Sequence, residues 1–301
     1  MSTSPKPHPE HPSTYFVQDR SNQDELKRLH IQDQLMTEVM GGVLPEQPDP
    51  ASFERVLDVG CGTGNWLIEV AKTYPTARQL AGIDVSRTFI EYARAQAEAE
   101  QVSDRVEFHV MDALRMLEFP SDSFDLVNQR AGMSYLRTWD WPKLLQEYQR
   151  VARPGGVIRV IEGDPSVESS SPALISLFAL TRQAFYQSGH LFTPESDGLT
   201  SHLARLLHQH GLQGLQKRVY RIEYHAGTLQ ADMFIEDMER GIRTGAPFLS
   251  KWTRLPDDYE EICQRAIREM HEPNFVATMN LLAVWGNVSD TIEQNPVDSP
   301  R

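Results

Sequence analysis

The hydrophobic positions between residues 55 and 164 follow two alternating patterns. Short apolar runs predict β-strands at 55–59, 79–85, 106–110, 124–128 and 157–161. Between them, helical spacing of apolar residues predicts helices over 65–74, 87–101 and 141–151, the last closed by Pro154-Gly155-Gly156. Strands and helices that alternate in this way form a parallel sheet covered by helices on both faces. We therefore predict an α/β fold with a doubly wound, mainly parallel sheet.

The pattern outside this region is mostly helical. One helix is predicted over 21–39, and the prolines between 45 and 50 separate it from the alternating region. Later helices are predicted over 172–187, 200–210, 231–241 and 256–271. Two further apolar runs, at 217–225 and 280–285, predict two more strands, which gives a sheet of seven strands. The chain thus divides into a tail and helix at 1–50, a core at 51–165, and helices with the last strands at 166–301.

The charge balance narrows the classes of partner. Lys and Arg number 29 against 42 Asp and Glu, which gives a formal net charge of −13. A surplus of acidic groups repels nucleic acid and anionic membranes, so we expect neither as a main partner. No apolar run approaches the ~20 residues needed to cross a bilayer. The N-terminus lacks the apolar stretch of a secretory signal.

Cysteine usage adds an expectation about metals and compartment. Cys61 and Cys263 form no metal-binding spacing, and no convincing set of acids and histidines does so either. We therefore expect no metal, and a reduced, cytoplasmic setting fits best. Prolines and polar residues in the first 13 positions predict a loose tail.

The most informative segment is the loop after the first predicted strand, which has the pattern D-x-G-x-G-x-G from Asp58 to Gly64. Glycines at such a strand-to-helix turn allow positive φ and a close approach of the backbone to a ligand. Asp84 lies 20 residues past Gly64, at the end of the next strand, where a carboxylate can accept hydrogen bonds from ribose hydroxyls. The alternative is a plain turn that binds nothing. The position of Asp84 at the end of the next strand makes this alternative less favoured.

The spacing of the glycines also separates two classes of cofactor. A dinucleotide fingerprint, G-x-G-x-x-G, needs a third glycine at position 65, where this chain has Asn65. Asp58, before the first glycine, disfavours a pyrophosphate and suits a ligand that bears ammonium and sulfonium groups.

Five motifs in order carry a resemblance to a known family. The glycine loop is followed by Gly82-Ile83-Asp84-Val85-Ser86, Val110-Met111-Asp112-Ala113, Phe124-Asp125-Leu126-Val127 and Arg153-Pro154-Gly155-Gly156. Over residues 54–165 the chain resembles class I S-adenosylmethionine (SAM) dependent methyltransferases of microbial secondary metabolism. The resemblance implies a Rossmann-like fold with SAM as cofactor and S-adenosylhomocysteine as product.

The same resemblance implies a set of cofactor-binding residues. They are Asp58, Gly60, Cys61 and Gly62 around the methionine part, Asp84 at the ribose, Val85, Asp112 and Ala113 at adenine, and Asn128 and Gln129 on the methyl-donor side. Such enzymes often cover SAM with an N-terminal helix, and the segment from Tyr15 to Gln34 fits that role. Helices after residue 165 would then cover the acceptor.

Several residues keep two interpretations. Arg130, Tyr135 and Trp139 follow the fourth strand, where parallel sheets place ligands, so they are substrate-pocket candidates or packing residues. Asp112 could cap the end of its strand instead of binding adenine. Cys61 is better explained as a small turn residue than as a reactive thiol.

Four further polar residues are equally open. Glu162 and Asp164 are either cleft acids or solvated strand-end residues. His190 and His225 could be general bases, but a single histidine is more often structural. The apolar residues between 233 and 252 form either a substrate lid or ordinary core. No residue is assigned as catalytic.

These observations predict a SAM-dependent methyltransferase that acts on O, N or C of a small molecule by in-line displacement. The methyl donor is already activated, so alignment and exclusion of water are the protein's main tasks. The acidic chain and the absence of an Asn-Pro-Pro-Tyr type sequence after the fourth strand favour a small acceptor. The alternative is a SAM-binding protein without methyl transfer, either a cyclisation catalyst or a regulatory module.

Overall fold

The structure, a computed structural model, describes Tyr15, Val17 and residues 23–289. The predicted tails, before residue 14 and after residue 290, lie outside the described residues, as does the start of the predicted first helix.

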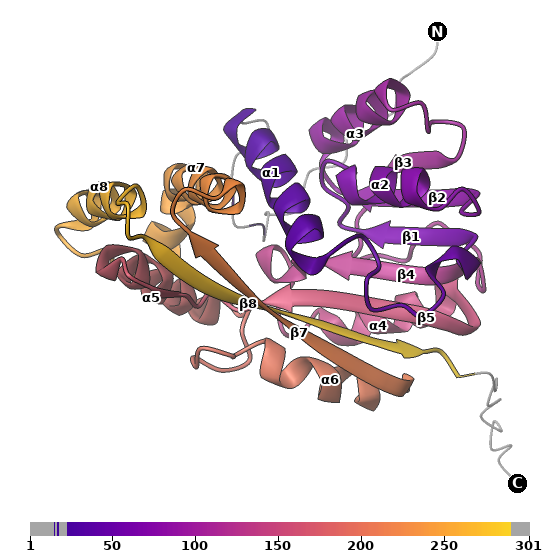
Figure 1. The fold of residues 1–301 in the computed structure, drawn as a ribbon. Coiled ribbons are helices and arrows are strands. Elements are labelled where there is room, and N and C mark those ends of the chain that lie inside the picture. The colour runs from indigo at the N-terminus through magenta and orange to yellow at the C-terminus, as the bar shows by residue number, and fades with distance from the viewer. Residues whose placement is uncertain (1–14, 16, 18–22, 290–301) are drawn as a thin grey trace, which may run out of the picture.

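An eight-stranded sheet forms the centre of the described chain, in the order β3-β2-β1-β4-β5-β8-β6, with β7 on the other side of β8 (Figure 1). Its strands are β1 (Arg55–Val59), β2 (Gln79–Asp84), β3 (Val106–Val110), β4 (Phe124–Arg130), β5 (Ala152–Gly163), β6 (Glu168–Ser169), β7 (Gln213–His225) and β8 (Val276–Asn287). The first five are parallel, and β8 runs antiparallel to β5 and β7. This confirms the predicted doubly wound α/β fold, with the two-residue β6 as an added strand.

The helices cover the sheet on both faces and extend past its end. They are α1 (Gln23–Met40), α2 (Asn65–Thr73), α3 (Arg87–Ala99), α4 (Trp141–Val151), α5 (Pro172–Gln187), α6 (Thr200–Gln209), α7 (Leu229–Trp252) and α8 (Tyr259–Met270), with short 3-10 turns at Pro50–Ser52 and Gly132–Ser134. Helices α2 and α3 pack on one face of β1–β3. On the other face of the sheet, α4 packs against β4 and β5, and α6 packs against β7 and β8. Helices α5, α7 and α8 form a second apolar cluster beside β7 and β8.

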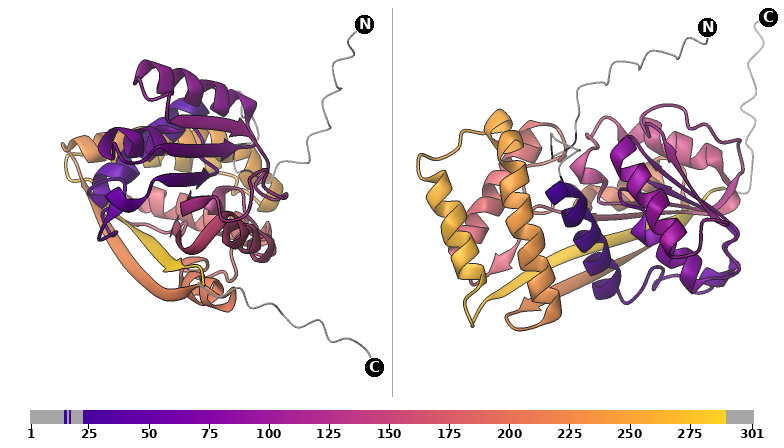
Figure 2. Two further views of the ribbon diagram at one scale, coloured as in Figure 1. Left: turned by 90° about the vertical axis from the view of Figure 1, so that its right-hand side faces the viewer. Right: turned by 90° about the horizontal axis from the view of Figure 1, so that it is seen from above.

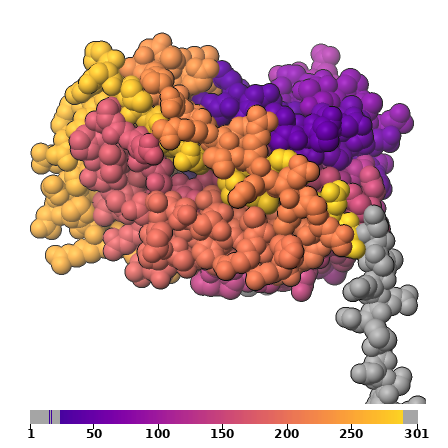
Figure 3. All heavy atoms as spheres, turned by 60° about the horizontal axis from the view of Figure 1, so that its bottom comes forward, coloured from indigo at the N-terminus to yellow at the C-terminus, as the bar shows by residue number. Residues whose placement is uncertain are grey.

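Helix α1 lies between α7 on one side and α2 and α3 on the other, as the view from above shows (Figure 2). The surface at the β7 edge of the sheet is formed largely by the later chain, in salmon and orange (Figure 3). Among residues 23–289, none of the helices combines the length and the apolar composition that a membrane span requires.

Two predicted boundaries were wrong. Helix α7 does not end at Gly241 but continues through Pro247 to Trp252, because Phe248 and Leu249 are buried and their packing outweighs the helix-breaking residues. Pro154-Gly155-Gly156 does not close α4, which already ends at Val151. These residues belong to β5, where the N–H of Gly155 and the carbonyl of Gly156 bond to Val288.

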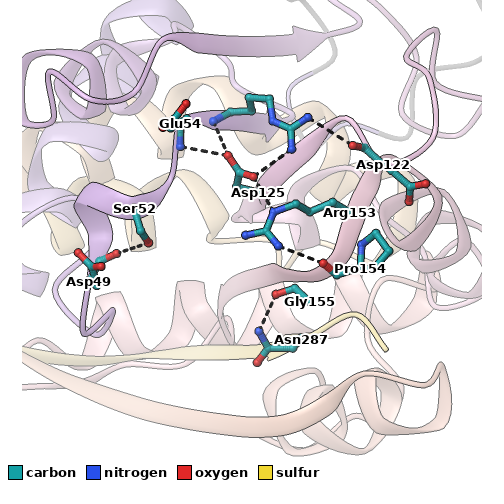
Figure 4. A network of polar contacts seen from close by, with 10 residues as sticks. Asp49, Ser52, Glu54, Asp122, Asp125, Arg153, Pro154, Gly155 and Asn287 are labelled. Atoms are coloured by element: carbon teal, nitrogen blue, oxygen red, sulfur yellow. Dashed lines mark hydrogen bonds and ion pairs between the residues drawn. The ribbon is translucent and has the colours of Figure 1, made fainter. Parts of the chain in front are cut away.

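The amino-terminal edge of the sheet is held by a buried carboxylate, Asp125 of β4 (Figure 4). It accepts hydrogen bonds from the N–H of Glu54 (3.1 Å) and of Arg55 (2.8 Å). The guanidinium groups of Arg153 (2.7 Å) and Arg55 (3.1 Å) also donate to it. Burial opposes its charge, but these donors hold the pKa of Asp125 below its usual range. These two motif residues, Asp125 and Arg153, are therefore structural, and the residues predicted to bind the cofactor lie at the opposite edge.

We predict that Gly64 cannot be replaced without loss of stability. Its φ is +75°, and an added Cβ would lie 2.5 Å from the Phe108 ring and 2.8 Å from the Cβ of Ala93. Gly227 has a similar φ of +82° with nothing within 4 Å, so it is a matched control. Gly227→Ala should cost ~1 kcal/mol of backbone strain, whereas Gly64→Ala adds overpacking and should cost ~2–4 kcal/mol in urea unfolding. Equal losses would contradict the packing argument.

Candidate active site

The loop between β1 and α2 turns through three glycines in the left-handed region, with φ of +69° at Gly60, +53° at Gly62 and +75° at Gly64. An added Cβ at Gly60 would lie 2.4 Å from the Tyr135 hydroxyl. At Gly62 the nearest atom would be Leu29 Cδ1 of α1, at 3.9 Å. Gly60 and Gly64 are thus required by neighbouring side chains, whereas Gly62 faces open space next to α1.

Asp84 ties the end of β2 to this loop. Its Oδ2 accepts from the N–H of Gly62 at 3.2 Å, and its Oδ1 accepts from the N–H of Ser86 at 2.7 Å. Val85 follows it and is 47% exposed, which is unusual for a large apolar side chain beside a buried strand. The end of β2 thus places a carboxylate against the glycine loop with an apolar surface beside it.

The end of β3 carries the next acid, Asp112. Its Oδ1 accepts from the N–H of Leu114 at 2.9 Å, and its Oδ2 lies 3.4 Å from Arg115 Nε. A residue that caps the end of a strand makes this kind of hydrogen bond, so the contact supports the capping interpretation of Asp112. Ala113 packs against the core next to it. The side chain of Asp112 remains 32% exposed, and its role toward adenine stays a prediction.

Asp58 is a buried acid at the start of the glycine loop, with 3% of its surface exposed. Burial raises the pKa of Asp58 to about 7, although Arg130 and a 2.7 Å hydrogen bond from Asn128 Nδ2 act in the opposite direction. Asn128 Oδ1 in turn accepts from Arg159 Nη1 at 2.8 Å, and Arg159 pairs with Glu46. A line of buried polar groups therefore runs from the linker before β1 to the glycine loop.

A second buried acid, Glu162 of β5, fixes the segment after β4. It accepts from Gln129 Nε2 (2.7 Å) and from the N–H groups of Gly132 (2.8 Å) and Met133 (3.1 Å). Burial raises the pKa of Glu162 to about 8. Glu162 is thus neither a solvated strand-end residue nor an open cleft acid. Asn128 and Gln129 are both fully buried, and each bonds an acid of this edge.

Tyr135 closes over the loop from the segment that Glu162 holds. Its hydroxyl donates to the carbonyl of Val59 at 3.5 Å, next to Gly60. Burial raises the pKa of the Tyr135 phenol well above its ordinary value, so it is protonated at neutral pH. Burial also raises the pKa of the Cys61 thiol, which favours a turn-filling role over a reactive one.

The structure places the other polar candidates in separate surroundings. Trp139 is 61% exposed and packs against Gly189. His190 is buried, with Nδ1 2.7 Å from Ser188 Oγ, and His225 is exposed on β7. Asp164 accepts from the N–H groups at the start of α6, which gives it a capping role.

Helix α1 contributes polar groups that sequence reasoning missed. Asp33 forms an ion pair with Arg130 at the end of β4. His30 lies three residues before Asp33 and Thr37 four residues after it, so all three share one face of the helix. The signal was present in the sequence, but a polar stripe on an amphipathic helix normally faces solvent.

Tyr15 lies in a different contact of α1. Its hydroxyl donates to Glu25 at 2.5 Å, and Glu25 pairs with Arg28 at 2.7 Å. Arg28 also reaches Asp237 of α7 at 3.2 Å. All four side chains are buried, so this network fastens α1 to α7. In the described part of the chain, no three His, Cys, Asp or Glu residues gather to hold a metal ion.

Comparisons with known proteins identify the family of the central segment. Residues 56–156 match the family described as a methyltransferase domain. This segment is a class I SAM-dependent methyltransferase domain. Its cofactor is SAM, as predicted.

Relatives match over different lengths. Methyltransferase GfsG of Streptomyces halstedii is 34% identical over 40% of this chain and 41% of its own length. The 27-O-demethylrifamycin SV methyltransferase of Amycolatopsis mediterranei is 26% identical over 85% of this chain and 79% of its own. The chain thus spans less than half the length of GfsG. The solved structure of the [4+2]-cyclase SpnF has the same fold, with a TM-score of 0.50 and 18% identity over 88% of this chain and 97% of that one.

The residues at the carboxyl edge of the methyltransferase domain fit SAM. A side chain at Gly62 would occupy the space beneath α1, and acids stand on both sides of the loop at Asp58 and Asp84. Carboxylates suit the positive sulfur and ammonium of SAM and the hydroxyls of its ribose.

We predict that SAM affinity rises with pH through the range in which Asp58 ionises. The raised pKa of about 7 means that Asp58 is mostly neutral at pH 6 and mostly charged at pH 7.5, and only the charged form attracts a cation. Calorimetric affinity should therefore increase by up to about eightfold over this range. An Asp58→Asn variant is the control. Ionisation of SAM itself affects its affinity equally in both proteins, so the variant should lose only the part of the pH dependence that comes from Asp58. An identical pH slope in both proteins would contradict the assignment.

Proposed function

We propose that this protein transfers the methyl group of SAM to an oxygen, nitrogen or carbon of a small-molecule acceptor. The observation that carries the proposal is the glycine loop, open at Gly62 and flanked by Asp58 and Asp84. Matches to GfsG and to the rifamycin methyltransferase support it, because both are named methyltransferases and the second modifies a small molecule.

In this proposal the domain's residues bind and align. Asp84 accepts from the ribose hydroxyls, with Val85 and Ala113 beside adenine and Asp112 toward its amino group. Asp58, Gly60, Cys61 and Gly62 surround the methionine part, and Asn128 and Gln129 stiffen the methyl-donor side from within the sheet. SAM, when bound, supplies a methyl group on a positive sulfur that an acceptor takes by in-line displacement. No protein nucleophile is needed, so positioning is the main contribution to rate.

The acceptor would be covered by the C-terminal third of the chain. Helices α5, α7 and α8 form an apolar cluster beside the sheet edge, and α7 is fastened to α1 through Arg28 and Asp237. Tyr135 lies against the loop and is the better acceptor-side candidate, whereas Trp139 is largely exposed. We also propose a reduced, cytoplasmic setting, no metal and no nucleic-acid partner, on the free thiols and acidic charge.

A SAM-binding protein without methyl transfer is the alternative. The fold it shares with SpnF, which is named a [4+2]-cyclase, keeps this alternative in consideration. Incubation with SAM and a panel of small metabolites separates the two. Methyl transfer gives S-adenosylhomocysteine together with an acceptor heavier by one CH₂ unit. Cyclisation gives an isomer of equal mass while SAM persists.

Asp84 provides a direct test of cofactor binding. Asp84→Ala should weaken SAM by ~1.5–3 kcal/mol in calorimetry, the loss of charge-assisted hydrogen bonds. Because Asp84 also accepts from the N–H groups of Gly62 and Ser86, Asp84→Asn serves as the second variant: it keeps a side-chain acceptor but loses the charge. It should lose less affinity than Asp84→Ala. Unchanged SAM affinity in a folded Asp84→Ala variant would overturn the ribose assignment.

A further inference from the structure

The ion pair between Asp33 of α1 and Arg130 of β4 is incomplete. Asp33 Oδ1 contacts Arg130 Nη2, but Asp33 Oδ2 and Arg130 Nε are buried without a hydrogen-bond partner among the described residues. A carboxylate and a guanidinium can pair through two parallel bonds, and here each keeps one unused atom. Buried polar atoms are rarely left unsatisfied, because a hydrogen bond that is not made there loses the solvation of the group without replacing it.

The position of this pair relates it to the glycine loop. Arg130 ends β4, the strand next to β1, and its guanidinium lies over the Trp66 ring with 5.3 Å to the centroid. Arg130 and Asp33 both act on the ionisation of Asp58, which starts the loop. On the α1 side, Leu29 lies one helical turn before Asp33 and is the nearest side chain to the open face of Gly62.

The two unused atoms have opposite requirements. Arg130 Nε–H needs an acceptor and belongs to a cation, while Asp33 Oδ2 needs a donor and belongs to an anion. A single cation or anion would satisfy one and repel the other. A zwitterion satisfies both and leaves the net charge of the site unchanged. Thr37 Oγ1 and His30 Nδ1, also buried without a partner in the described structure, lie on the same helical stripe of α1.

We propose that Asp33 and Arg130 recognise the zwitterionic amino-acid end of SAM, Arg130 Nε–H donating to its carboxylate and Asp33 Oδ2 accepting from its ammonium group. This inference rests on the proposed function and deepens it, because it adds a residue of α1 to the cofactor site. In this proposal, α1 covers the cofactor and also binds its amino-acid end.

The test measures three nucleosides by calorimetry on the full chain, and each nucleoside is compared only between the parent and a variant, because the third also lacks the sulfonium charge. They are SAM, decarboxylated SAM, which keeps the ammonium but lacks the carboxylate, and 5′-methylthioadenosine, which lacks both. Arg130→Met should weaken SAM by about 10- to 100-fold, the loss of a charged hydrogen bond, and leave the other two within about twofold. Asp33→Asn should weaken SAM and decarboxylated SAM, and leave 5′-methylthioadenosine unchanged.

Arg240→Met is the matched control. Arg240 of α7 pairs with Asp24 near the start of α1, so its loss also removes an ion pair of α1 but touches no residue of the loop. It should leave the order of the three affinities as in the parent. If Arg130→Met fails to fold, Arg130→Lys keeps the charge without Nε, and it should still weaken SAM relative to decarboxylated SAM.

The outcomes separate this inference from the proposed function. Equal weakening of all three nucleosides by Arg130→Met and Asp33→Asn would overturn it, since the pair would then only position α1. Unchanged SAM affinity in folded variants would overturn it as well, while the parent protein still binds SAM and transfers methyl. A parent protein that binds none of the three nucleosides would instead overturn the proposed function.

Discussion

The left-handed turn from Gly60 to Gly64 is the contact point on which the rest of the carboxyl edge depends. Tyr135 packs on Gly60, Phe108 of β3 packs on Gly64, and Asp84 of β2 bonds the N–H of Gly62. The approaches of Tyr135 and Phe108 need positions without a side chain, and the bond from Asp84 needs the turned backbone that places the Gly62 N–H. The loop therefore holds three neighbouring segments in one arrangement. Of the three glycines, only Gly62 has no side chain packed closely on it. It is therefore the position at which a ligand could approach the backbone of the loop.

The burial of ionisable groups is the second constraint at this edge. Asp58, Arg159 and Glu162 are almost completely buried, and each is bonded to side chains or N–H groups. Burying an ionisable group without partners is costly, so these networks hold the strands and the segment after β4 in one geometry. The same burial raises the pKa of Asp58 to about 7, so the loop begins with an acid that titrates near neutral pH.

Ion pairs also decide where α1 lies. The buried Arg28–Asp237 pair fastens it to α7, and the Asp33–Arg130 pair fastens it to the end of β4. The helix therefore bridges the cofactor-binding half of the molecule and the helices that would cover an acceptor.

The sequence by itself determined the sheet, the glycine loop and the order of the acids that follow β1, β2 and β3. Period-two runs and the D-x-G-x-G-x-G spacing are local, and they fix where strands end and where a carboxylate stands relative to them. Local signals were wrong at Gly241 and Pro247, where α7 continues, and at Pro154-Gly155-Gly156, which lie in β5. In both places, burial and pairing with distant residues outweighed the local preference.

Only the tertiary structure decided which polar residues meet. Asp33 and Arg130 are 97 positions apart, and Glu46 and Arg159 are 113 apart, so no spacing rule relates them. In the sequence, the stripe formed by His30, Asp33 and Thr37 is indistinguishable from a solvated helix face. The same holds for Glu162, whose position after a strand predicts a cleft acid or a solvated one but not three donors around it. Hydrogen-bond partners depend on distance in space, and distance in space is fixed only when the whole chain has packed.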